Sequence, residues 1–181
     1  MYVPIVVIRP SAGKPANDMA INRGKQFEKV IQAGFKQLPY VAIDRINDAT
    51  GGYMGIKSYC DYIIYRRPYA YYIECKAISG NTLNFQSHIS ETQWNGLYTR
   101  SLVDGAIAGI LVWFTEHDKT YFVDIRVLHE LRDRNYRSLN IKDLPFKGLK
   151  TLELRGVKKR VLFNYHLVEF LRDMEAMYDG N

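Results

Sequence analysis

Two segments, YIECKAIS at residues 72–79 and SYCDYIIY at residues 58–65, determine the fold that we expect for this chain. Both are short apolar and aromatic runs, which are typical of strands in the interior of a sheet. Because side chains alternate between the faces of a strand, Glu74 and Lys76 share one face and Cys75 points to the other. Two opposite charges on one face of a buried strand require an explanation.

The two segments predict a hairpin around the sequence RRPY at residues 66–69. If these four residues form the loop, which is a common length, Tyr65 pairs with Ala70. Counting back one residue on each strand then places Asp61 opposite Glu74, with Cβ atoms roughly 4.5–5.5 Å apart. A shift of one residue would separate the two carboxylates, so this expectation depends on the loop.

This register gathers two carboxylates and an amine, from Asp61, Glu74 and Lys76. Two like charges this close are unfavourable unless a positive charge lies between them. Mg²⁺ is suitable, because it commonly takes one or two carboxylates together with water and substrate phosphate. A lysine beside the metal can activate water or stabilise charge at phosphorus, so the set predicts phosphodiester hydrolysis. The alternative is a pair of strand-edge carboxylates with Lys76 in an ordinary ion pair, since E-x-K is a common tripeptide.

The composition is that of one globular domain. The chain has 181 residues, of which 47% are hydrophobic and 13% aromatic, enough for a substantial core. The formal charge of +6 permits a nucleic acid or an anionic membrane as a partner. No apolar run is long enough to span a bilayer, and the first residues do not resemble a signal peptide. Cys60 and Cys75 lie in strand-like runs and suit a reduced, intracellular protein, and the four scattered histidines argue against a zinc site.

Helical and strand-like patterns alternate along the chain. Residues 1–21 are expected to be a flexible segment or arm, and residues 22–181 a single domain. The order of the elements predicts an α/β or α+β domain with a central mixed β-sheet and flanking helices. The expected elements are a helix capped by Asn22 and ended by Pro39, strands at 40–46, 59–65, 70–77, 105–114 and 119–126, a helix opened by the capping box SETQ at 90–93, a short helix at 127–135 and a last helix capped by Asn164.

The D-x₁₂-E-x-K pattern on a hairpin resembles the PD-(D/E)XK nuclease superfamily, with Cys60 in place of the usual proline. Over roughly residues 22–126 the chain resembles, more closely, the RecU-type Holliday junction resolvases of Gram-positive bacteria and their phages. The similar segments are NRGKQFEKVI (22–31) for the N-terminal helix, SYCDYIIY and YIECKA for the catalytic strands, NFQSHISETQ (84–93) for the following segment, and GILVWF and TYFVDI for the next hairpin. The ordered set of segments is specific, although no single one is.

The resemblance implies a restriction-endonuclease-like α/β core and a Mg²⁺-dependent endonuclease that cleaves branched DNA, with Mn²⁺ able to substitute. It implies a homodimer, because two symmetric cuts in a four-way junction need two sites. It also implies a cytoplasmic location, in a bacterial cell or a phage-infected host. A restriction, nicking or repair nuclease of the same fold is an alternative, and so is a DNA-binding protein that does not cleave. The intact Asp61, Glu74 and Lys76 favour an enzyme.

Carried over to this sequence, the resemblance assigns Asp61 and Glu74 to the metal and Lys76 to activation of water. Glu28 would be a further acidic residue near the metal, or else a solvated helix residue. Gln93 matches an active-site position of the family, but it is also the fourth residue of the capping box, which is a purely structural role.

Basic residues outside this set are candidates for phosphate contact, which positions DNA without reading its sequence. For each of them the alternative is an ordinary solvated surface. They are Arg23 in the expected first helix, Arg66 and Arg67 at the hairpin tip, and Arg155, Lys158, Lys159 and Arg160 of the segment RGVKKR.

The family inserts a long stalk before the catalytic aspartate, whereas here only residues 46–60 occupy that place. This difference bears on junction specificity more than on nuclease chemistry.

Overall fold

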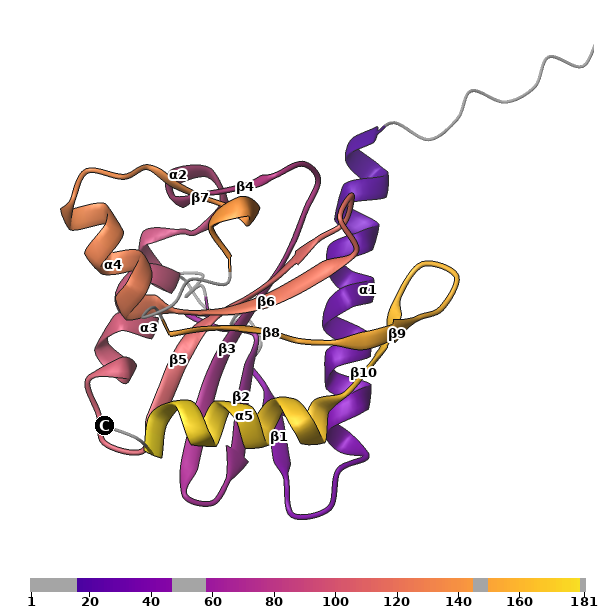
Figure 1. Ribbon diagram of the computed structural model, residues 1–181, viewed down its shortest axis with the longest axis vertical. Coiled ribbons are helices and arrows are strands. Elements are labelled where there is room, and N and C mark those ends of the chain that lie inside the picture. Colours follow the sequence, from indigo (N-terminus) through magenta and orange to yellow (C-terminus); the bar gives the residue numbers. More distant parts are fainter. Residues whose placement is uncertain (1–15, 47–57, 145–149, 180–181) are drawn as a thin grey trace, which may run out of the picture.

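The computed structural model describes residues 16–46, 58–144 and 150–179. The first 15 residues of the expected arm and most of the segment that replaces the stalk lie outside these residues. A six-stranded sheet in the order β1-β2-β3-β5-β6-β8 forms the centre of the molecule (Figure 1). Its strands are β1 (Ala42–Arg45), β2 (Tyr62–Arg66), β3 (Tyr69–Ile78), β5 (Ala106–Phe114), β6 (Lys119–Asp124) and β8 (Thr151–Glu153).

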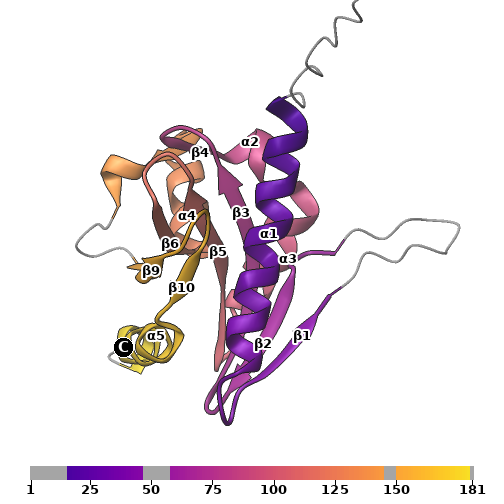
Figure 2. The same cartoon turned by 90° about the vertical axis from the view of Figure 1, so that its right-hand side faces the viewer.

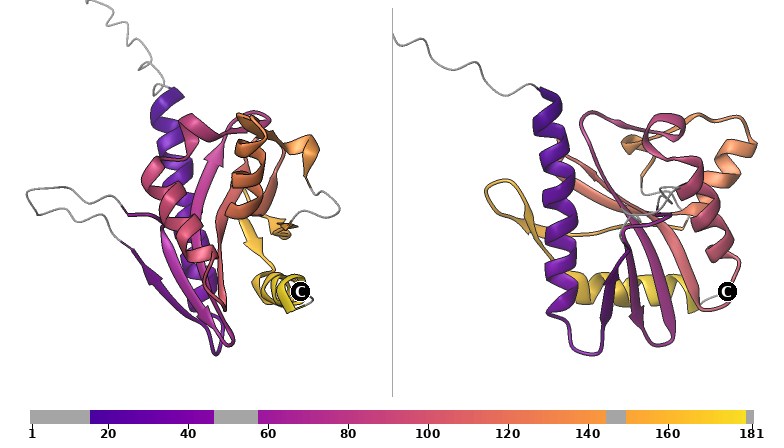
Figure 3. Two further views of the ribbon diagram at one scale, coloured as in Figure 1. Left: turned by 90° about the vertical axis from the view of Figure 1, so that its left-hand side faces the viewer. Right: turned by 180° about the vertical axis from the view of Figure 1, so that it is seen from behind.

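The sheet is mixed, because β3 and β5 run parallel while the other neighbouring strands are antiparallel. Helices flank it, and helix α5 crosses in front of the strands in Figure 1 and behind them in the reverse view of Figure 3. The predicted α/β architecture with a central mixed sheet and flanking helices is therefore confirmed. The helices are α1 (Ala16–Lys36), α2 (Phe85–His88), α3 (Glu91–Ser101), α4 (Ile125–Asp133), α5 (Leu167–Asp179) and the short 3₁₀ helix η1 (Ile141–Asp143).

Two small antiparallel ladders lie outside the main sheet. Strand β4 (Thr82–Asn84) pairs with β7 (Ser138–Asn140), and β9 (Gly156–Lys158) pairs with β10 (Phe163–Tyr165). The second pair forms a hairpin that projects beside α1 (Figure 1). In the part of the chain that the structure describes, no helix has the length and apolar character needed to cross a membrane.

Each face of the sheet has its own hydrophobic cluster, because side chains alternate along every strand. On β5, Leu111 and Trp113 belong to the cluster formed with α1 and α5, whereas Ile110 and Val112 belong to the cluster formed with α3 and α4. Figure 2 shows the sheet close to edge-on, with α5 on one side and α3 on the other. Both faces of β3 and β5 are thus covered, which explains their nearly continuous apolar sequences.

Three helices differ in their bounds from the sequence expectation, and one of them, α4, spans Ile125–Asp133 rather than 127–135. Helix α1 begins at Ala16 rather than after Asn22, because the Pro- and Gly-rich part of the chain ends at Pro15. Asn164 does not cap the last helix but lies in β10 opposite Val157, and α5 begins three residues later. The last helix itself is present as predicted, and its buried side chains include Phe170, Leu171 and Met174.

Candidate active site

The hairpin of β2 and β3 has the predicted register. Tyr65 pairs with Ala70, and pairing continues through Arg66 and Tyr69, so the turn is two residues long rather than four. The register is unchanged because one residue is added to each strand. At the other end the last pair is Tyr62 with Ile73. Asp61 and Glu74 are the next residues along the two strands, just beyond this last pair, so their predicted direct pairing lies outside the ladder.

The candidate site forms where β2 and β3 separate. Strand β2 begins at Tyr62, whereas β3 continues to Ile78. The N–H of Asp61 donates to the carbonyl oxygen of Ile73 (3.0 Å), and the N–H of Cys75 donates to Asp61 Oδ2 (2.8 Å). The aspartate side chain thus takes the place of a backbone acceptor on the neighbouring strand, which fixes its carboxylate at the split edge.

Packing against α3 holds the segment that carries Asp61. The guanidinium of Arg100 lies over the Tyr59 ring, 4.3 Å from its centroid. Gly96 allows this approach, since a Cβ at that position would lie 2.2 Å from Tyr59 Cβ. Any larger residue at position 96 would push the segment away from the helix and displace the Asp61 carboxylate with it.

Glu74 is at the centre of a compact polar cluster. Its Oε1 atom lies 2.8 Å from Lys76 Nζ and accepts a hydrogen bond of 2.5 Å from Gln93 Nε2. Lys76 Nζ also donates to Gln93 Oε1 at 3.3 Å. The glutamate and the lysine share a face of β3 as the alternation predicts, and α3 brings the glutamine to them.

Gln93 also completes the capping box of α3. Its backbone N–H donates to Ser90 Oγ (3.2 Å), and its Oε1 accepts from the N–H of Ser90 (3.0 Å). The sequence left open whether Gln93 is a cap or belongs to the site. The geometry gives it both contacts, because one amide group has separate donor and acceptor atoms.

Burial dominates the electrostatics of Glu74, which is 4% exposed. Loss of solvation and, next, the negative charge of Asp61 raise the pKa of its carboxyl to about 8, although Lys76 opposes the rise. At neutral pH, without a cation, the structure therefore favours the protonated form of Glu74. A carboxyl with such a pKa in a polar cluster is a recognised sign of a functional site.

Glu28 reaches the same region from α1. Its Oε2 accepts from Arg45 Nη2 at 2.9 Å, and its backbone carbonyl accepts from the hydroxyl of Tyr62 at 3.1 Å. Burial raises the pKa of its carboxyl, and the next largest cause is the charge of Asp61. Glu28 is therefore not a solvated helix residue: it is an acidic neighbour of Asp61, held by an arginine that the sequence reasoning did not identify.

The oxygen atoms at this edge are suitable for a hard divalent cation. Asp61 and Glu74 supply carboxylates, and the unfavourable burial of Glu74 as an anion is the kind of cost that a bound cation offsets. Within residues 16–46, 58–144 and 150–179, no group of three His, Cys, Asp or Glu side chains is placed to hold a metal ion. A magnesium ion here would thus depend on two carboxylates, water and substrate phosphate.

Two of the basic candidates flank the turn between β5 and β6. Arg23 Nη1 donates to Thr115 Oγ1 (3.3 Å), and Thr115 N–H donates to the carbonyl of Ile78 at the end of β3 (2.9 Å). On the same turn, Asp118 forms an ion pair with Lys158 of β9. Arg23 and the β9–β10 hairpin are therefore brought to the β5–β6 turn, beside the C-terminal end of the strand that carries Glu74 and Lys76.

The remaining basic candidates are dispersed. Lys159 and Arg160 are exposed at the tip of the β9–β10 hairpin, and Arg155 pairs with Asp173 of α5 at 3.5 Å. Arg66 and Arg67 lie at the turn of the β2–β3 hairpin, five residues along β2 from Asp61, roughly 17 Å away at 3.3–3.4 Å per residue. Arg66 pairs with Glu175 at 3.2 Å. The structure does not bring Arg66 and Arg67 to the candidate site.

His88 lies beside the cluster and was not identified from the sequence. Its Nδ1 accepts from the N–H of Asn84 at 3.1 Å. Burial lowers the pKa of the imidazole, and the charge of Lys76 lowers it further. The signal in the sequence was its position just before the capping box of α3, but its closeness to Lys76 depends on the tertiary fold.

The chain is similar to known recombination proteins. The model of the RecU family, Recombination protein U, matches residues 30–170, which is more than half of the chain. Among solved structures, a Holliday junction resolvase, Hjc, from Archaeoglobus fulgidus is 18% identical over 57% of this chain and 78% of its own, with a TM-score of 0.42. The comparison with curated proteins found no match.

Proposed function

The chain belongs to the RecU (Recombination protein U) family, and from this premise we propose that it is a Mg²⁺-dependent endonuclease that resolves branched DNA. The observation that carries the proposal is the meeting of Asp61, Glu74 and Lys76 where β2 and β3 separate. Family membership supports the resolvase activity that the sequence resemblance implied. The metal, the form of DNA that is cut and the dimer are parts of the proposal.

In this proposal Asp61 and Glu74 hold the cation. When bound there, a divalent cation would supply charge neutralisation at the scissile phosphate and a more acidic water. Lys76, 2.8 Å from Glu74 Oε1, keeps a positive charge beside the position of the phosphate and orients the attacking water. Gln93 fixes the Glu74 carboxylate through its 2.5 Å hydrogen bond. Glu28 adds negative charge near Asp61, which strengthens the attraction for a divalent cation.

The basic residues at the same end of the sheet fit a DNA surface. Arg23 and Lys158 lie on either side of the turn between β5 and β6, close to the end of β3. Lysine and arginine at such positions contact phosphates and position the duplex arms without reading sequence. A homodimer would place two such sites on one four-way junction, as paired cuts require. The proposal places this reaction in the cytoplasm of a bacterial cell or a phage-infected host.

The test is a labelled series of DNA substrates incubated with Mg²⁺ or with EDTA. The series comprises a four-way junction, a flap, a linear duplex and a single strand. We expect cleavage of the junction in Mg²⁺ and binding without cleavage in EDTA. Asp61→Asn should abolish cleavage and retain binding, because it removes a ligand charge but little volume, and Asp104→Asn, in the exposed turn before β5, is the matched control.

Each other outcome selects an alternative. Cleavage of duplex or flap in preference to the junction would indicate a restriction, nicking or repair nuclease of the same fold. Binding in EDTA with no cleavage of any substrate in Mg²⁺ or Mn²⁺ would indicate a DNA-binding protein that does not cleave. Full activity of Asp61→Asn would show that the assigned site is wrong.

A further inference from the structure

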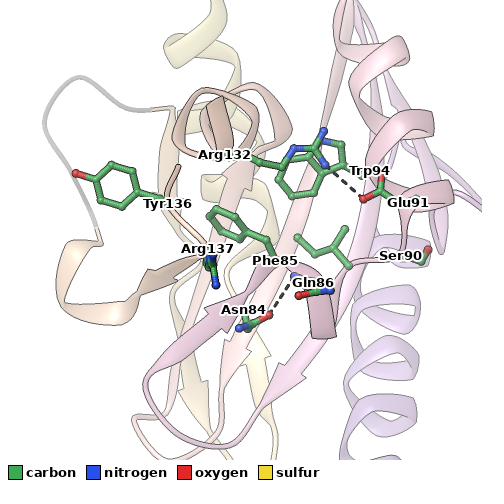
Figure 4. Close-up of a pocket in the computed structure, with 10 residues that line it drawn as sticks. Asn84, Phe85, Gln86, Ser90, Glu91, Trp94, Arg132, Tyr136 and Arg137 are labelled. Atoms are coloured by element: carbon green, nitrogen blue, oxygen red, sulfur yellow. Dashed lines mark hydrogen bonds and ion pairs between the residues drawn. The ribbon is translucent and has the colours of Figure 1, made fainter. Parts of the chain in front are cut away.

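A pocket of about 550 Å³ lies beside the candidate active site, between α2, α3 and the chain that follows α4 (Figure 4). We call it the α2–α4 pocket; its main lining residues are Asn84, Phe85, Trp94, Arg132, Tyr136 and Arg137. Its volume is within the range of ligand pockets, roughly 300–1,000 Å³. Neither the metal site nor the basic residues discussed above account for it.

The pocket and the candidate active site share the capping box as a wall. Ser90 lines the pocket, and its N–H donates to Gln93 Oε1 at 3.0 Å. On the other side, Gln93 Nε2 donates to Glu74 Oε1 at 2.5 Å. Two hydrogen bonds therefore connect the pocket to the carboxylate that we assign to the metal.

Flat π surfaces dominate the lining. The rings of Phe85 and Trp94 are buried, with centroids 5.6 Å apart. The guanidinium of Arg132 lies over Trp94, 3.9 Å from the ring centroid, and Glu91 holds it through an ion pair of 3.5 Å (Figure 4). Tyr136 completes the set and is 57% exposed. Aromatic rings and guanidinium planes are the surfaces on which proteins stack unpaired bases.

Tyr136 is the most informative of these residues, because the fold does not require its ring. Its backbone N–H donates to the carbonyl of Leu131 at 2.9 Å, which closes the chain after α4, while the side chain stays in solvent. Figure 4 shows the ring on the opposite side of the pocket from Ser90 and Glu91. A large aromatic side chain that is exposed at the rim of a pocket is placed to contact a ligand.

The polar groups of the pocket match a nucleotide. Arg137 is exposed, and within the described parts of the chain no ion pair engages its guanidinium, in contrast to Arg132. Gln86 presents an exposed amide, which can donate to and accept from the edge of a base. A cation for a phosphate, an amide for a base edge and flat surfaces for the ring are the components of single-strand recognition.

We propose that the α2–α4 pocket holds one unstacked nucleotide of the strand being cut, with its base against Tyr136 and Arg132 and a phosphate at Arg137. The inference rests on the proposed function, since it places this nucleotide beside the scissile phosphate. Extruding a base costs least where the helix is already interrupted, so a branch point, where stacking of the arms is broken, supplies such a base more readily than a continuous duplex. The pocket thereby favours branched DNA by a means separate from the metal site.

The experiment uses four-way junctions that carry 5-iodouracil at one thymine position each, bound in EDTA and irradiated. Cross-linked peptides are then identified by mass spectrometry. We expect a position near the branch to cross-link within residues 84–94 or 132–137, and the same base in a continuous duplex to give no such product. Cross-links confined to other segments would overturn the inference.

Two variants give a second readout. Tyr136→Ala should weaken junction binding by roughly 5- to 150-fold, the range for loss of one stacked base, and should affect duplex binding much less. Tyr136→Phe should restore binding, because the ring is retained. Tyr65→Ala, at a 51% exposed tyrosine near the far end of β2, is the matched control and should bind normally. Equal loss of junction and duplex binding in Tyr136→Ala, at unchanged melting temperature, would overturn the inference.

The outcomes separate this inference from the proposed function. Junction cleavage in Mg²⁺ without a cross-link in the pocket would refute the inference and leave the nuclease standing. A pocket cross-link on a protein that never cleaves would support the inference and refute the nuclease. Absence of any binding to branched DNA would refute both.

Discussion

The most discriminating prediction concerns the proton on Glu74. The perturbation is Glu74→Gln, which keeps the shape of the side chain and an acceptor for Lys76 and Gln93 but removes the ionisable group. Burial raises the pKa of this carboxyl from 4.5 to about 8. Between these two pH values the folded protein retains a proton that the unfolded chain has released. The carboxyl should therefore destabilise the metal-free fold progressively as the pH rises through that range.

The magnitude follows from linkage. The folded state binds up to one more proton than the unfolded state, so the free energy of unfolding falls by up to about 1.4 kcal/mol per pH unit. From about pH 5.5 to about pH 7.5 this amounts to roughly 2–3 kcal/mol. Below the unfolded value of 4.5 both states are protonated and the effect is absent, and above about 8 both are ionised and it no longer grows.

The assay is urea unfolding in EDTA at a series of pH values for the wild type and for Glu74→Gln. The difference between the two proteins isolates Glu74, because the other titrating groups are common to both. The gap should widen with pH in favour of the variant. Glu130→Gln, at a half-exposed carboxylate on α4, is the control and should follow the wild type. Saturating Mg²⁺ should oppose the loss of stability in the wild type alone, because a cation binds the ionised carboxyl.

Parallel curves for the wild type and Glu74→Gln would refute the reasoning. They would mean that Glu74 is ionised in the metal-free fold at neutral pH, with Lys76 compensating its burial in full. The raised pKa would then be no sign of a cation site.

Three further predictions use the same structure. Gln93→Glu should keep the capping box, and with it the melting temperature, but should lower cleavage because it removes the amide donor to Glu74; normal cleavage would leave Gln93 as a cap alone. Neutralising Lys158, Lys159 and Arg160 together should reduce the log–log salt dependence of DNA binding by about 2 to 3 units, and an unchanged slope would show a merely solvated hairpin. Tyr178→Phe should lower the free energy of unfolding, measured in urea, by about 1–3 kcal/mol, because the Tyr178 hydroxyl donates to the fully buried carboxylate of Asp124 at the start of α4. A change below about 0.5 kcal/mol would contradict this.

Only the tertiary structure shows which residues distant in sequence reach the candidate site. Glu28 and Gln93 lie far from the hairpin in sequence and reach it only because α1 and α3 pack against the strands on opposite faces of the sheet. The sequence could not distinguish a solvated Glu28 from one near the candidate site, because burial depends on which face of α1 meets β1. Arg66 and Arg67 show the opposite case, since basic residues close to the site in sequence are separated from it by the length of β2.

The register of the hairpin was determined by the sequence alone. Tyr65 opposite Ala70, and Glu74 on the same face as Lys76, follow from chain connectivity and the two-residue period of a strand, which no tertiary contact alters. The burial that raises the pKa of Glu74, the amide that holds it and the pocket beside it came only from the tertiary structure. Those properties arise where separate elements meet, and the free energy of that packing depends on the whole core rather than on any short segment.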